Sequence, residues 1–180
     1  ALDMAGRVVT AQGRAALWWL IGGASAMGLG IWSMHFVGML ALNLPIPVGY
    51  DVGITLASLA IGIGASTFAL WLVSRRELPW PRLVGGALLM GAGVAGMHYT
   101  GMAALRMNPG IQYNPGRFGV SVVIAVLASG VALWIAFRLR RQSRRVRALR
   151  AGSAVVMGVA IVGMHYTGMS AAAFPLGSVC

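Results

Sequence analysis

The sequence MGLGIWSMHFVGM at 27–39 recurs as MGAGVAGMHYTGM at 90–102 and as MGVAIVGMHYTGM at 157–169. When the three copies are aligned on their histidines, each carries Met at positions −8, −1 and +4 and Gly at positions −7 and +3. The copies contain all three histidines of the chain and nine of its 11 methionines. Imidazole and thioether groups are therefore concentrated in one repeated unit, which decides both the fold and the candidate site.

Composition predicts a membrane protein. Hydrophobic residues make up 58% of the chain and charged residues only 9%, whereas about a quarter of the residues of a soluble domain are charged. A helix of roughly 20 apolar residues crosses a bilayer, and a soluble helical bundle would need polar faces that the apolar segments of this chain lack. We therefore predict an all-α, polytopic transmembrane helical bundle whose five complete helices lie at 15–42, 52–74, 83–105, 118–137 and 151–174.

The net charge of +11 is distributed unevenly between the two ends of the predicted bundle. Only Arg106 and Arg117 fall on one side, and the other arginines fall on the opposite side, which the positive-inside rule makes cytoplasmic. This bias predicts a multi-pass membrane protein, and it explains the charge without nucleic-acid binding. Anionic membrane lipid is the expected partner of the basic cluster at 138–150.

The motif belongs to a larger repeat. The segments ASTFALWLVSRR (65–76) and ASGVALWIAFRLRR (128–141) each precede a basic turn and then a histidine helix. The chain thus reads as a single domain, 1–180, of three two-helix units at about 1–42, 52–105 and 118–174. Ala1-Leu2 matches the Ala-Leu of those segments, so we expect roughly 15–20 further residues of a first helix upstream and a further crossing after 174.

The repeated motif is a candidate metal site. On an α-helix, positions −7, 0 and +4 form one stripe, and positions −8, −1 and +3 form its neighbour. Three such helices running in the same direction could turn these faces toward a shared axis in the outer half of the bilayer. Because one helix cannot complete a metal shell, the ligands would come from several helices. The candidates are His35, His98, His165, Met34, Met97, Met164, Met39, Met102 and Met169.

The ligand types favour copper. Imidazole and thioether together suit copper, Cu(I) in particular. The acids Asp3, Asp51 and Glu77 all lie at helix ends, so a divalent ion would keep its full charge in a medium of low dielectric constant. Zinc on three histidines and haem with histidine or methionine ligands are the alternatives. Zinc leaves the methionines unexplained, and the chain has no CxxCH haem attachment motif. Cys180 alone supports neither a disulfide framework nor a thiolate site.

Packing is the competing explanation for part of this pattern, because methionine is a flexible apolar filler in helices. For Met27, Met90 and Met157, a second metal layer and plain packing both fit. The hydroxyl groups of Tyr99 and Tyr166 fit hydrogen bonding better than metal ligation. Among function classes, a sensor explains the buried soft ligands and the short outer connections at 43–51 and 106–117. A copper transporter, copper store or membrane copper enzyme and a purely structural module are the alternatives.

The literal sequence MHYT at 97–100 and 164–167, with MHFV at 34–37, resembles the MHYT domain, a bacterial integral-membrane sensory module of six or seven helices. The resemblance implies a location in the bacterial inner membrane, copper binding and sensing of O₂, CO or NO. It also implies control of a cytoplasmic output such as diguanylate cyclase or phosphodiesterase, with no catalytic residues in this chain; a homodimer is compatible with it. The first copy departs from the pattern at Phe36 and Val37. The implied ligands are Met34, His35, Met97, His98, Tyr99, Met164, His165 and Tyr166.

Overall fold

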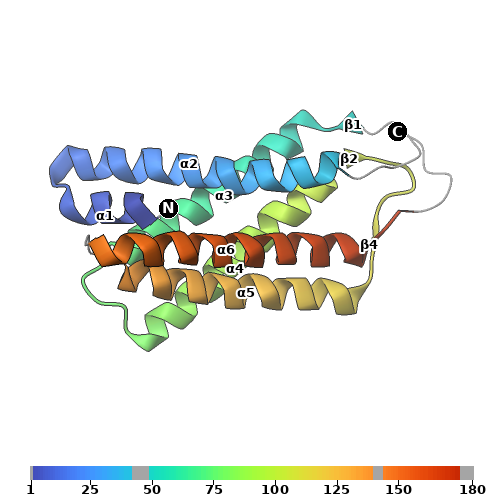
Figure 1. Ribbon diagram of the computed structural model, residues 1–180. Coiled ribbons are helices and arrows are strands. Elements are labelled where there is room, and N and C mark those ends of the chain that lie inside the picture. The colour runs from blue at the N-terminus through green and yellow to red at the C-terminus, as the bar shows by residue number, and fades with distance from the viewer. Residues whose placement is uncertain (1, 42–48, 140–143, 175–180) are drawn as a thin grey trace.

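The computed structural model describes residues 2–41, 49–139 and 144–174, and it confirms the predicted all-α bundle (Figure 1). The predicted features at 43–48, Arg140, Arg141 and Cys180 lie outside these ranges. Five helices are long and apolar enough to cross a membrane. The helices in these ranges are α1 (Leu2–Thr10), α2 (Gly13–Leu40), α3 (Val52–Val73), α4 (Trp80–Ala103), α5 (Pro115–Arg138) and α6 (Arg144–Ala171).

Local sequence signals set the ends of the helices. Asp51 caps α3 by accepting a 3.0 Å hydrogen bond from the Ile54 amide, and Asn114 caps α5 by accepting a 3.1 Å bond from the Arg117 amide. Gly13, the first residue of α2, has a φ of 56°, a conformation that favours glycine. Helix α6 begins seven residues earlier than predicted, at Arg144 instead of 151, because arginine is a good helix former and extends the helix through the basic segment.

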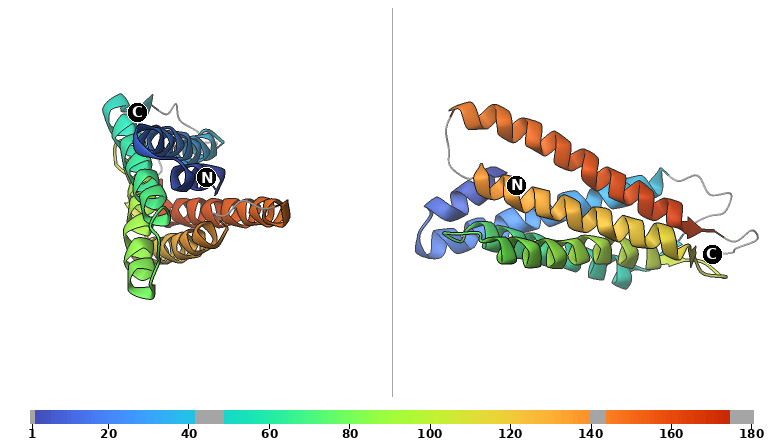
Figure 2. Two further views of the ribbon diagram at one scale, coloured as in Figure 1. Left: turned by 90° about the vertical axis from the view of Figure 1, so that its left-hand side faces the viewer. Right: turned by 90° about the horizontal axis from the view of Figure 1, so that it is seen from below.

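The helices that carry the motif alternate with helices that lack it. We call α2, α4 and α6 the histidine helices and α3 and α5 the plain helices. Helix α3 packs against both α2 and α4, and α5 packs against both α4 and α6. The end-on and lower views show the same neighbours, with α6 standing apart from α3 (Figure 2). The histidine helices all run in the same direction, as the repeat predicts, so their motifs lie at one level of the bundle.

Glycine at position −7 allows two of these packings. A Cβ atom on Gly28 would lie 2.7 Å from the Cα of Ile63 in α3, and one on Gly91 would lie 2.6 Å from the Cα of Val126 in α5. Any side chain there would force the helices apart, since protein interiors are close-packed. The equivalent Gly158 in α6 has no atom within 4 Å of such a Cβ position. In the first two copies, the backbone of the histidine helix therefore packs directly against the backbone of a plain helix.

Two short strand pairs close the end of the bundle opposite the basic turns. Strand β1 (Gly49–Tyr50) pairs with β2 (Leu105–Arg106), and β3 (Gln112–Tyr113) pairs with β4 (Ala172–Ala173), both antiparallel. The pairs occupy equivalent places in the repeat. The sequence predicted turns at 49–50, at Arg106 and at 112–113, but it wrongly extended the helices over Leu105 and over 172–173, because α4 ends at Ala103 and α6 at Ala171. At the basic end, Arg75 stacks on Trp71 and Arg138 on Trp134, with guanidinium-to-ring distances of 4.1 and 5.6 Å. We call these two ends the strand end and the basic end.

Candidate metal centre

The three histidines meet in the interior of the bundle. His35 from α2, His98 from α4 and His165 from α6 are each at most 1% exposed. The Nδ1 atom of His35 lies 3.1 Å from Nδ1 of His98 and 3.2 Å from Nδ1 of His165. One ring nitrogen from each histidine lies within 4.8 Å of the others. The structure thus brings together the three imidazoles that the repeat predicted to face one axis.

The geometry of this cluster fits a metal ion. Metal–nitrogen bonds of about 2.0–2.1 Å place two nitrogens of one tetrahedral or trigonal centre about 3.3–3.6 Å apart. The two Nδ1 pairs are only a few tenths of an ångström closer than that. An imidazole nitrogen offers one in-plane lone pair or one proton. If the contacts are hydrogen bonds, the single lone pair of Nδ1 in His35 must accept from both other rings, whereas in a metal site the three lone pairs can share one cation.

The outer nitrogens of the rings lack the support usual at metal sites. The Nε2 atoms of all three histidines are buried and have no hydrogen-bond partner among the residues described. A metal-bound histidine normally donates its second N–H to a carbonyl, a carboxylate or water. In this bundle that edge of each ring lies instead against a glycine of another histidine helix. The contact fixes the position of the ring sterically.

The methionines at position +4 gather on the strand side of the histidines. Met102 is fully buried and Met39 is 3% exposed, and the half-buried Met169 packs against them in one apolar cluster with Leu105. Position +4 lies about 6 Å along the axis from its histidine, because a helix rises 1.5 Å per residue. The structure therefore places a layer of thioethers one turn from the imidazoles.

The methionines at position −1 occupy helix interfaces instead of one shared cluster. Met97 packs beside Gly62 of α3, and Met164 packs against Val94 of α4 and Ala125 of α5. Met34 is half-buried and lines a cavity on the basic side of the histidines. Of the two predicted sets of soft ligands, the +4 set is the one that the fold assembles.

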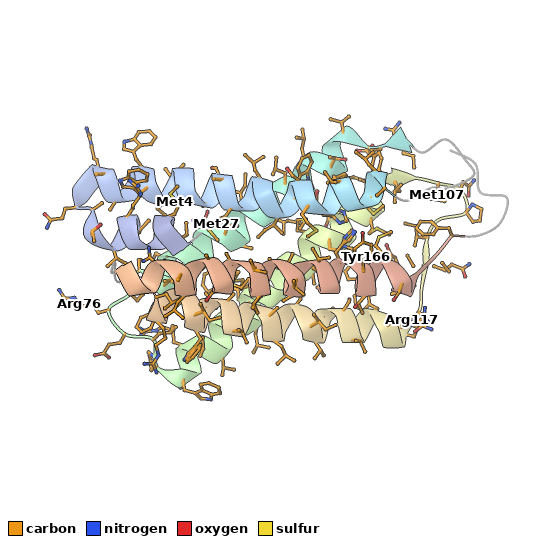
Figure 3. All side chains as sticks on the ribbon, in the orientation of Figure 1. Met4, Met27, Arg76, Met107, Arg117 and Tyr166 are labelled. Carbon is orange, nitrogen blue, oxygen red and sulfur yellow. The ribbon has the colours of Figure 1, made fainter. Side chains whose placement is uncertain are left out.

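The methionines at position −8 all line that cavity, which has a volume of about 630 Å³. Its walls come from α2 to α6, and Arg150 is the one charged residue among those lining it. Figure 3 shows Met27 nearer the basic end and Tyr166 nearer the strand end. Met27, Met90 and Met157 thus converge at a level separate from the histidines, in apolar surroundings where either predicted role, packing or a second ligand layer, remains open to test.

The aromatic residue after each histidine is used differently in each copy. The Tyr99 hydroxyl lies 2.6 Å from the Ser121 hydroxyl, which itself donates to the Phe118 carbonyl. Tyr99 therefore donates to Ser121, while its ring meets His98 edge-on at 4.8 Å between centroids. Tyr166 is 59% exposed, and its hydroxyl has no hydrogen-bond partner within the part of the chain that is described. The fold directs neither hydroxyl toward the histidine nitrogens.

Trp32 takes over this hydrogen bond in the first copy, where Phe36 has no hydroxyl. The Trp32 indole N–H donates to Ser58 at 3.1 Å, and its ring lies 4.6 Å from that of Phe36. Ser58 and Ser121 each lie seven residues after a helix-capping residue and are fully buried. Neither serine is among the site residues predicted from the sequence. Their equivalent positions in two apolar helices were the signal that could have identified them.

The repeat that carries this centre matches a described family. The family model for MHYT, a "bacterial signalling protein N terminal repeat", matches residues 28–86, 91–149 and 158–180, which together are most of the chain. The chain belongs to the MHYT family. Each matched segment begins at or near the motif, and the first two continue into the following plain helix.

Relatives of this MHYT domain include signalling proteins. The chain is 71% identical over its full length to the bifunctional diguanylate cyclase/cyclic di-GMP phosphodiesterase MucR of Pseudomonas aeruginosa, covering 26% of that protein. It is 42% identical over 96% of its length to the signaling protein YkoW of Bacillus subtilis, and 41% identical over 95% to the cyclic di-GMP phosphodiesterase NbdA of P. aeruginosa, covering 22% of each. The chain thus spans about a quarter of these relatives. No solved structure matches it.

Proposed function

We propose that this MHYT domain is a membrane sensor that binds copper through the Nδ1 atoms of His35, His98 and His165. The observation that carries the proposal is the convergence of three buried imidazole nitrogens from three different helices, two of the pairs 3.1 and 3.2 Å apart. Intramembrane ionisable groups are costly and mark functional sites. A packing module would have no reason to place three of them in contact.

Copper is the metal that the surroundings favour. The nearby +4 methionines supply thioether sulfur, a soft donor that suits Cu(I). Asp51 caps α3 and pairs with Arg106, Glu77 lies beyond the end of α3, and Asp3 belongs to α1. The histidine helices contain no acidic residue, so the donor set is neutral. A monovalent ion costs less than a divalent one in such a site. Zinc remains the second candidate, because three histidine nitrogens form a known zinc donor set.

Haem fits this centre less well than a single ion. The three imidazole rings are in mutual edge contact, with centroid separations of 4.8, 5.2 and 5.2 Å. A porphyrin between two axial ligands would need the rings to stand apart on its two faces. Copper would supply a redox-active centre with affinity for diatomic molecules such as O₂, CO or NO.

The relatives support a signalling role. MucR and NbdA are named for cyclic di-GMP turnover, so we propose that the MHYT domain controls a cytoplasmic output of that kind in its full-length protein. The basic end would face the cytoplasm of an inner-membrane protein, following the positive-inside rule. At that end α4 and α6 each follow a plain helix, and α2 follows α1. A shift between helices at the histidines could therefore reach the output side, provided that the two states bind the signal differently.

The first experiment measures metal content and its dependence on the histidines. The domain is purified in detergent and analysed for copper and zinc by mass spectrometry. We expect copper at a fixed ratio to protein, and its loss from the His98→Ala and His165→Ala variants while both remain folded by circular dichroism. Copper at the wild-type ratio in the double variant would refute the proposed site. Zinc in place of copper would support the second candidate.

The second experiment tests the sensor. The full-length protein is reduced, loaded with copper and exposed to NO or CO. We expect binding to alter hydrogen exchange at the segments 75–82 and 138–150 and to change the rate of cyclic di-GMP turnover. The His98→Ala variant, which keeps the output region intact, is the control and should not respond. A copper-loaded protein that binds neither gas would instead indicate a copper store.

A further inference from the structure

Each histidine ring rests on the glycine at position +3 of another copy of the motif. The imidazole of His35 in α2 lies against Gly101 in α4, that of His98 in α4 lies against Gly168 in α6, and that of His165 in α6 lies against Gly38 in α2. The contacts close a ring, because each histidine helix supplies one imidazole and receives another. The two members of each pair lie on different helices, so the spacing within one motif does not predict the contact.

These contacts leave no room for any side chain. A Cβ atom built on Gly101 would overlap Nε2 of His35, and one on Gly38 would overlap Nε2 of His165 in the same way. On Gly168 the distance to Nε2 of His98 would be 2.5 Å. The imidazoles cannot step aside, because their Nδ1 edges already meet the other rings at 3.1 and 3.2 Å.

We propose that Gly38, Gly101 and Gly168 are positioning residues that hold the three imidazoles in a closed ring. Each glycine covers the Nε2 edge of one histidine and leaves its Nδ1 facing the shared axis. The proposal rests on the proposed metal site only where it assigns Nδ1 as the ligating atom. The steric contact itself belongs to the protein without any metal.

The ring arrangement makes the three repeats respond together. Displacing one imidazole toward its Nε2 edge pushes the backbone of the next histidine helix, whose own imidazole rests on the third helix. A change at any one histidine is therefore passed to all three helices. Coupling of this kind needs discrete, close-packed contacts, which the histidine–glycine pairs provide.

Glycine-to-alanine substitution separates this role from ordinary helix packing. In a helix interior, alanine is normally the more favourable residue. Gly85 lies in α4, the same helix as Gly101, and a Cβ there meets nothing within 4 Å. Gly30 in α2 and Gly163 in α6 are equally open and serve as controls for Gly38 and Gly168.

The test is thermal unfolding of the purified domain in detergent with metal removed by a chelator. We expect Gly101→Ala to lower the unfolding midpoint by several degrees and Gly85→Ala to leave it unchanged or raise it. The decisive comparison is a double-mutant cycle. His35→Ala, added to Gly101→Ala, should recover more of the lost unfolding temperature than His98→Ala added to Gly101→Ala. His98 lies on the same helix as Gly101, but its Nε2 edge rests on Gly168. The cycle pairing Gly168→Ala with His98→Ala should behave equivalently.

Equal midpoints for Gly101→Ala and Gly85→Ala, or a larger rescue by His98→Ala than by His35→Ala, would overturn the proposal. The Gly101→Ala single variant could fail to fold. In that case a folded Gly101→Ala/His35→Ala double variant supports the proposal, and an unfolded double variant contradicts it. Metal content measured separately distinguishes the two proposals. Rescue specific to His35→Ala, combined with no copper in the separate metal analysis, would refute only the copper site. Bound copper in that analysis, combined with equal midpoints for Gly101→Ala and Gly85→Ala, would refute only the positioning role.

Discussion

Nδ1 of His35 lies 3.1 Å from Nδ1 of His98, although 63 residues separate the two in the sequence. Between them the chain runs the rest of α2, all of α3 and most of α4. The contact shows that the two histidines lie at the same depth in the bundle and that the motif faces of α2 and α4 turn toward each other. His165 joins the same pair from α6 at 3.2 Å, which extends the relationship to the whole bundle.

The +4 methionines should strengthen metal binding without being needed for the fold. Met102→Leu nearly conserves volume, and such swaps usually cost less than about 1.5 kcal/mol. We expect this variant to keep its unfolding midpoint without metal and to bind Cu(I) more weakly, measured by competition with a chromogenic chelator. Met4→Leu, in α1 near the basic end, is the matched control and should bind as the wild type does. An unchanged affinity in Met102→Leu would remove this thioether from the ligand set.

The Tyr99–Ser121 hydrogen bond should contribute to stability in the second copy. Tyr99→Phe and Ser121→Ala each remove one partner of the 2.6 Å contact, and such losses typically cost about 0.5–1.5 kcal/mol. Because both act on the same bond, the double variant should be less destabilised than the sum of the single variants. Tyr166→Phe should be nearly neutral, since that hydroxyl is exposed. Additive effects in the double-mutant cycle would show that the two hydroxyl groups do not interact.

Asp51 should make stability depend on acid pH. The side chain of Arg106, at 2.9 Å, and the Ile54 amide hold the pKa of the Asp51 carboxyl below its ordinary value of 3.8. A depressed pKa in the folded state gives a contribution that is present above pH 3.8 and lost as the pH falls through the folded value.

Asp51→Asn tests this contribution, because it keeps an oxygen acceptor for the helix cap and removes the charge. The wild type should have the higher unfolding midpoint at pH 7, and the difference should shrink below about pH 4. A difference that grows on acidification would show that the sign is wrong.

The basic end should face the cytoplasm. In a background carrying Cys180→Ser, Gln112→Cys places a probe in the exposed strand β3, and Glu77→Cys places one in the exposed turn after α3. A membrane-impermeant maleimide added to intact cells should label the first probe and reach the second only after lysis. The reverse pattern would invert the topology and move the histidines to the cytoplasmic half of the bilayer.

Hydropathy and repetition predicted much of the fold. The apolar segments predicted the five long helices. The repeat predicted that the histidine helices run in one direction and that Trp71 and Trp134 occupy equivalent positions. Such patterns predict helices because a segment that crosses a bilayer must be long, apolar and helical. The strand pairs at 49–50 with 105–106 and at 112–113 with 172–173 were missed, since two-residue strands leave no periodic pattern.

The sequence by itself determined that imidazole and thioether groups recur at fixed places on three parallel helices, because helix geometry converts spacing into position on a face. Only the tertiary structure decided that the Nδ1 atoms of the three histidines face one another and that each imidazole rests on a glycine of another copy. It also decided that the +4 methionines gather in one cluster, whereas Met97 and Met164 lie in helix interfaces. Those outcomes depend on how far each helix is rotated about its own axis. That rotation is set by close packing between residues distant in the chain, such as Gly28 with Ile63 and Gly91 with Val126, and no local pattern records it.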